Sequence, residues 1–169
     1  MLNNLLIYRL LILNMIGFAI VAWAYIKGHL EIIFKGDAAI LGAIMVAVFL
    51  AGLVSLFIRA SKVSTALNDL KAGRAVNPAK FSIKNSHIGY TGVVLATIGL
   101  IGILIGMVMA VHGFSSADAQ ASADRMAVGM EVAFSATLIS LSLALWMGIN
   151  FQMLKTATSL LMVDARDAG

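Results

Sequence analysis

The stretch that decides the fold is GMEVAFSATLISLSLAL, residues 129–145. It is apolar along most of its length, yet it carries one Glu, one Thr and three Ser. It lies inside an apolar segment from Val128 to Leu154, and about 20 such residues suffice to cross a bilayer as a helix. An acid near one end and hydroxyls along the helix indicate a membrane span that does more than anchor the chain.

The composition of the whole chain places this stretch in an integral membrane protein. Of its 169 residues, 61% are hydrophobic and 12% are charged, and the mean hydropathy is +0.98. A soluble domain of this size needs more polar surface. The chain has no Cys, which excludes disulfides and Cys-based metal sites, and its three His show no ligand spacing. The pI near 9.6 comes mostly from one loop between spans, so we expect contact with lipid and not with nucleic acid.

Four apolar segments are long enough to span the membrane. Because backbone groups in lipid must be satisfied within each segment, they predict an all-α integral membrane protein with four transmembrane helices. Arg9 is expected to reach the interface from the edge of the first span, which is expected to be a retained helix and not a signal peptide. The predicted spans are Leu10 to Ile26, Ala38 to Ile58, Tyr90 to Val111 and Val128 to Leu154.

The distribution of charge predicts the orientation of the chain. The loop 59–87 has a large excess of positive charge, because it contains several Lys and Arg residues and Asp69 is its one acidic residue. The positive-inside rule therefore puts this loop and both termini in the cytoplasm. The expected organisation is a membrane hairpin over 1–58, a short basic cytoplasmic linker over 59–87, and a second hairpin with a short cytoplasmic tail over 88–169. The basic residues of the loop are Arg59, Lys62, Lys71, Arg74, Lys80 and Lys84.

The connections carry local signals. STALNDLKAG, residues 64–73, is expected to be a short helix that extends the second span and ends through Gly73 and Pro78. GFSSADAQASAD, residues 113–124, is expected to be a flexible cap on the second hairpin, with Ser122 or Asp124 as the N-cap of the fourth span.

Small residues recur at spacings of three and four in the last two spans. Such residues let helix backbones approach closely in lipid. Two interpretations stay open: packing of the hairpin on itself, or close contact with other subunits or a central guest helix. The residues are Gly99, Gly102 and Gly106 in the third span and Gly129, Ala133 and Ala144 in the fourth.

The polar residues of the fourth span divide by face. Thr137 and Ser140 share the face of the small residues, and Thr137 is the residue for which a function is favoured. Ser135 and Ser142 lie off that face, and their hydroxyls are expected to bond back to their own helix. Glu131 has two open interpretations: an interfacial acid near a helix N-terminus, where the dipole favours an anion, or a proton or cation relay at the outer mouth of a pore.

Two motifs carry a family resemblance. GLIGILIG, residues 99–106, resembles the G-L-x-G-T-x-x-G signature of the MotA/TolQ/ExbB proton-channel family, and GMEVAFSATLIS, residues 129–140, resembles its G-I-x-E-A-L-x-T-T-x-x-G segment. The resemblance implies a pentamer in the bacterial inner membrane around two copies of a single-span, Asp-bearing partner of the MotB/TolR/ExbD kind. It implies no cofactor other than a proton or sodium motive force, and it matches Thr137 to a channel-facing Thr of the family. The acid and the hydroxyls themselves indicate an ion pathway along Thr137, Ser140 and Glu131.

The chain departs from the family pattern at several positions. Its middle region is too small for the domain with which flagellar stators push a rotor. The alternatives are a small four-helix proton-coupled multidrug antiporter and a non-conducting scaffold with the same ring architecture. No motif of an enzyme is present, so an enzymatic activity is not expected. The departures are Ile103 for the motif Thr, Val132 aligned with the family Glu so that Glu131 is one position away, Ala136 for the first Thr, Ser140 for Gly and Trp146 for a frequent Pro.

Overall fold

The computed structural model describes residues 5–28, 38–74, 76, 79–113 and 119–167, and almost all of these described residues lie in four long helices. All four are long and apolar enough to cross a membrane, and the described residues contain no strand. The predicted all-α membrane fold with four transmembrane helices is therefore confirmed. The helices are α1 (Leu5–Ile26), α3 (Ala38–Lys71), α4 (Ala79–Gly113) and α5 (Ala119–Asp167).

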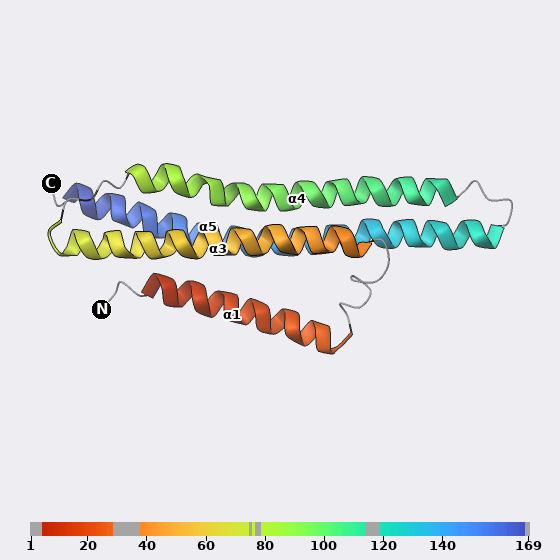
Figure 1. Ribbon diagram of the computed structural model, residues 1–169, viewed down its shortest axis with the longest axis horizontal. Coiled ribbons are helices and arrows are strands. Elements are labelled where there is room, and N and C mark those ends of the chain that lie inside the picture. The colour runs from red at the N-terminus through yellow and green to blue at the C-terminus, as the bar shows by residue number, and fades with distance from the viewer. Residues whose placement is uncertain (1–4, 29–37, 75, 77–78, 114–118, 168–169) are drawn as a thin grey trace.

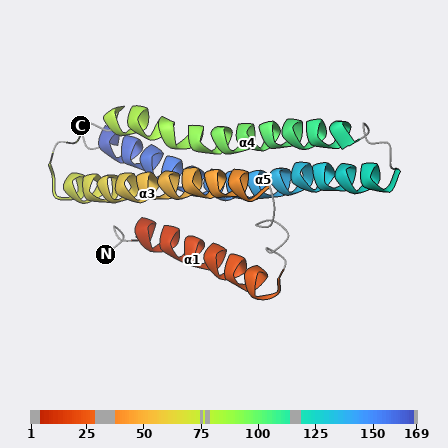
Figure 2. The same cartoon turned by 45° about the vertical axis from the view of Figure 1, so that its right-hand side comes forward.

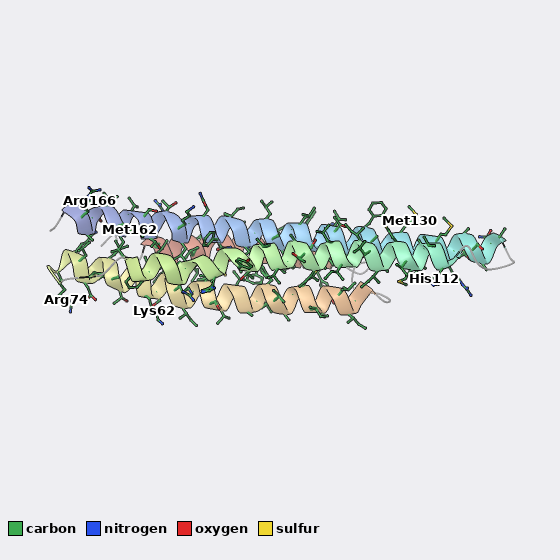
Figure 3. The ribbon with its side chains drawn as sticks, turned by 90° about the horizontal axis from the view of Figure 1, so that it is seen from above. Lys62, Arg74, His112, Met130, Met162 and Arg166 are labelled. Carbon is green, nitrogen blue, oxygen red and sulfur yellow. The ribbon has the colours of Figure 1, made fainter. Side chains whose placement is uncertain are left out.

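The helices lie side by side along one long axis (Figures 1 and 2). α4 and α5 form an antiparallel pair with the most extensive contact in the molecule, α3 packs on both, and α1 lies at the edge against α5 and α3. α1 begins, α3 ends, α4 begins and α5 ends at the same end of the bundle. Figure 3 shows Lys62, Arg74 and Arg166 toward this end and His112 toward the other. The cytoplasmic location of the basic end stays a prediction of the positive-inside rule.

The helices run well past the apolar spans. At about 1.5 Å per residue, the 49 residues of α5 extend about 74 Å, more than twice the thickness of a bilayer core. Residues 59–87, expected to be a linker, are mostly helical, because α3 continues to Lys71 and α4 begins at Ala79. The expected helical extension over residues 64–71 is confirmed.

Gly73 ends α3 as expected. Its φ of +75° is the left-handed conformation that favours glycine at a helix C-terminus. The Arg74 amide donates to the Asp69 carbonyl at 2.9 Å and the Gly73 amide to Leu70 at 3.0 Å, a Schellman arrangement. The Arg74 guanidinium also pairs with the Asp69 carboxylate at 2.7 Å. Pro78, the other expected terminator, lies outside the described residues.

The predicted N-caps of the fourth span are wrong. α5 begins at Ala119, so Ser122 and Asp124 lie inside the helix and not at its start. The stretch AQASADRMA has alternate alanines, and alanine has the highest helix propensity, so the helix begins before the apolar span does. Gln120 Nε2 also donates to Asp124 Oδ1 at 3.3 Å, a pairing four residues apart that supports the added turns.

The buried core lies between α3, α4 and α5, while the outward surfaces of all four helices are rich in exposed large apolar side chains. α1 buries the smallest share of its span. Exposed apolar surface on this scale is the property of a protein solvated by lipid tails. The largest fully buried side chains of the three core helices are Met45, Leu56, Leu95, Met147, Leu154 and Leu161.

Candidate functional site

The small residues of α4 and α5 pack against each other. Gly99 lies against Ser140, and Gly102 lies against Ala136. Gly106 faces backbone: a Cβ added there would lie 2.6 Å from both the Ala133 nitrogen and the Gly129 oxygen. No larger residue fits without separating the helices, so these glycines are needed for the close approach.

This packing follows the first of the two interpretations of the small residues. Gly99, Gly102, Gly106 and Gly129 are buried inside the subunit, and Ala133 is half-buried beside them. Ala144 lies at the edge of the contact, with its carbonyl oxygen 3.6 Å from the position of a Cβ on Gly92. A pore-lining role for this set stays a prediction.

Three hydroxyls in the middle of α5, those of Ser135, Thr137 and Ser140, bond back to their own helix. Ser135 Oγ donates to the Glu131 carbonyl at 2.7 Å, which confirms the prediction for this serine. Thr137 Oγ1 donates to Ala133 at 2.8 Å, and Ser140 Oγ donates to Thr137 at 3.0 Å. Each hydroxyl hydrogen is thus used within the helix, and each oxygen keeps the capacity to accept a hydrogen bond.

The three residues of the predicted ion pathway do not share one face of α5. Ser140 is buried against α4, Thr137 is half-buried and Glu131 is exposed. At about 100° per residue, the nine positions between Glu131 and Ser140 put them on opposite sides of the helix. Glu131 also lies twelve positions after Ala119, the first residue of α5, so it gains nothing from a helix dipole that acts only within the first turn. The prediction that Glu131 lies near a helix N-terminus is therefore wrong.

Thr137 lies on the flank of the hairpin that α1 and α3 leave uncovered. Relative to Ser140, which faces α4, Thr137 is rotated by about 60° to one side and Asn150 by about 80° to the other. On the Asn150 side, α5 contacts α1 through Asn14 and α3 through the rings of Trp146 and Phe49. We call the opposite side, which carries Thr137, the open flank of the α4–α5 hairpin.

Ile103 lies on the same open flank. Gly102 faces both Ala136 of α5 and Leu41 of α3, and one residue further Ile103 is rotated by about 100°, away from α3. The contacts of Gly102 and Gly106 with α5 place Ile103 within about half a turn of Thr137 in depth. Two of the three positions that carry a Thr in the family motifs are therefore neighbours here, as Ile103 and Thr137, and the third is Ala136, which lies against Gly102.

Residues 43–166 match the MotA/TolQ/ExbB proton channel family. The chain belongs to this family. Comparison with curated proteins and with solved structures gives no match. The resemblance inferred from two motifs is confirmed, and the match extends it from α4 and α5 to most of α3. α1 lies outside the matched range.

In this MotA/TolQ/ExbB family member, the structure contains two buried hydrogen-bonded contacts between helices that the sequence analysis did not predict. Asn85 Nδ2 of α4 donates to Thr158 Oγ1 of α5 at 2.9 Å. Asn14 of α1 pairs with Asn150 of α5 at 2.8 Å. For Asn14 and Asn150 the available signal is a lone Asn within an apolar span, because an unpaired amide in lipid is costly and therefore predicts a partner. Asn85 precedes the apolar span and carries no such signal.

Proposed function

We propose that this chain is the channel-forming subunit of an ion-driven motor complex in the bacterial inner membrane. In this proposal five copies surround two copies of a single-span, Asp-bearing partner, and a proton or sodium motive force drives movement of the ring. One charge that crosses 100 mV releases about 2.3 kcal/mol, enough to bias such a movement. The family match over residues 43–166 supports the class of function.

The observation that carries the proposal is the position of Thr137 on the open flank. α1 and α3 occupy the other side of the hairpin, so in a ring they are suited to the lipid-facing periphery. The open flank has half-buried Thr137, Ile103 and Ala144, and a Cβ on nearby Gly148 would meet nothing within 4 Å. A surface with small residues, Ala144 and Gly148, and with the hydroxyl of Thr137 is suited to turn past a partner helix.

Glu131 has a different place in this proposal. It is exposed and rotated by about 120° from Thr137, so the two side chains do not face one central axis together. An acid in contact with lipid is costly, and ionisable groups in membranes face protein or water. We therefore assign Glu131 to the contact with a neighbouring subunit or to the outer surface, and Thr137 to the channel.

A non-conducting scaffold with the same ring is the second candidate. It is favoured by Ile103, which replaces the hydroxyl beside Thr137 with an apolar side chain, and by the hydrogen bond from Thr137 to its own helix. A scaffold would assemble with the same partner but would pass no ions.

The composition of the complex tests the proposal. The chain would be co-expressed with its neighbouring genes, solubilised gently and weighed by native mass spectrometry. We expect five copies with two copies of a single-span, Asp-bearing protein. A dimer without such a partner would contradict the ring and favour the four-helix antiporter.

A further inference from the structure

Specific interactions are needed to hold α1 against the other helices. It lies outside the family match and buries the smallest share of its apolar span. Lipid tails solvate an apolar helix as well as another helix does, so hydrophobicity alone does not hold α1 in place. Specific packing and hydrogen bonds must do so.

A pair of buried amides joins α1 to α5. Asn14 Nδ2 donates to Asn150 Oδ1 at 2.8 Å, and Asn150 Nδ2 donates in return to Asn14 Oδ1 at 3.2 Å. The second hydrogen of Asn14 goes to the Leu10 carbonyl at 2.7 Å, and that of Asn150 goes to the Trp146 carbonyl at 3.0 Å. The side chains are only 3% and 0% exposed. All four amide hydrogens are used, so the pair has no donor left for a ligand and acts as a contact between helices.

The Trp146 side chain completes this contact. Its indole nitrogen donates to Asn14 Oδ1 at 3.0 Å. The ring fills the space left by Gly17 of α1, where an added Cβ would overlap the indole. It also meets Phe18 of α1 edge-on at 5.2 Å and Phe49 of α3 at 4.9 Å. Trp146 therefore contacts two other helices at once.

We propose that Asn14, Asn150 and Trp146 form an amide clip, a docking site that fixes the register of α1 on α5 of its own subunit. The clip recognises a helix that presents an Asn with a Gly three residues later, because the amide must reach Asn150 while the backbone clears the indole. With α1 clipped, α1 and α5 move as one body. This inference rests on the contacts alone and holds whether or not the subunit conducts ions.

A cysteine cross-link tests the register. The chain has no Cys, so an introduced pair is the only reactive one. Leu10 lies four residues before Asn14 and Leu154 four residues after Asn150, and the two helices are antiparallel (Figure 1), so both leucines lie one turn from the clip toward the same end. Both are fully buried. We expect oxidation of the Leu10→Cys/Leu154→Cys protein in membranes to give an intrachain cross-link.

The clip predicts which variants lose that cross-link. Asn14→Leu should lower its yield several-fold, because it leaves Asn150 without its partner. Asn85→Leu is the matched control, since it removes another buried interhelical amide, and should keep the yield. If Asn14→Leu alone fails to accumulate, the Asn14→Leu/Asn150→Leu protein leaves no orphan amide and should accumulate with a low yield. An unchanged yield without the amides, cross-linked dimers, or no cross-link in the parent would each overturn the proposal.

Fluorescence gives a readout that general loosening of the fold does not reproduce. With Trp23→Phe, Trp146 is the single Trp of the chain. We expect Asn14→Leu to shift its emission to shorter wavelength, because the indole N–H loses its acceptor, and Asn85→Leu to leave the emission unchanged. An emission that is the same in all three proteins would mean that the bond to Asn14 does not form.

Discussion

The contacts of α5 with α4 and with α1 show two different ways of holding helices together in lipid. The α4–α5 contact is continuous and depends on missing side chains: Gly99, Gly102 and Gly106 let the backbones approach. The α1–α5 contact is local and depends on polar groups, chiefly Asn14 and Asn150. The first should therefore be sensitive to added volume and the second to a lost hydrogen bond. The family match includes the first contact and leaves out α1.

The largest effect on stability is expected from added volume at the centre of the hairpin. Gly106→Ala puts a methyl group 2.6 Å from two backbone atoms that cannot move independently. We expect a loss of about 1–3 kcal/mol in the free energy of unfolding, measured as a lower midpoint of thermal unfolding in detergent. Gly148→Ala, with nothing within 4 Å, is the control and should leave the midpoint unchanged or raise it. Equal midpoints would show that the backbones do not meet at Gly106.

A smaller loss is expected from added volume beside the clip. In Gly17→Ala the new methyl group meets the six-membered ring of the Trp146 indole, a side chain that can shift more easily than backbone. We expect a loss of about 1 kcal/mol, at the lower end of the range for overpacking, together with a change in Trp146 emission. Gly92→Ala, whose Cβ would have a single contact at 3.6 Å, is the control for both measurements. If the Gly17→Ala protein had the same Trp146 emission as the parent, the close contact between Gly17 and the indole ring would be contradicted.

The smallest effect on stability is expected on the open flank. Ile103→Thr replaces a half-buried apolar side chain with a hydroxyl that can bond to its own helix, so the change should stay within about 1 kcal/mol. Because the new hydroxyl lies beside Thr137, ion flux through the complex in liposomes should rise. Ile105→Thr makes the same substitution at an exposed position of α4 that is rotated by about 160° from Ile103, and it should not change the flux. A similar response to both variants would remove the distinction between the two faces.

Hydropathy predicts the four membrane spans of the fold, but it does not predict the full length of the helices. Apolar runs predict the four spans because lipid selects for them directly. They do not predict where each helix ends, since the segments 59–71 and 119–127 are helical without being apolar. Alanine-rich sequence and helix propensity decide those turns, and a capping signal such as Ser122 is overridden by them.

The sequence predicted which residues belong to the candidate site better than it predicted which face of the helix each of them occupies. The motifs located Thr137 and the glycines, but the face of each residue depends on which helices cover which side of α5. The pairing of Asn14 with Asn150 joins positions 136 apart in the sequence, and neither local spacing nor periodicity reports it. The misplaced helix start also gave Glu131 a dipole contact that the structure does not provide.

The central claim, that the open flank lines the ion path, is tested most directly by ion flux through the reconstituted complex in liposomes. Thr137→Val would be compared with Thr97→Val. Thr97 is exposed on α4, and its hydroxyl bonds to Val93 at 2.9 Å, much as Thr137 bonds to Ala133 at 2.8 Å. Each variant therefore loses the same kind of bond, on different faces. We predict a several-fold loss of flux for Thr137→Val and the parent's flux for Thr97→Val. The parent's flux in both variants, or the same loss in both, would contradict the claim.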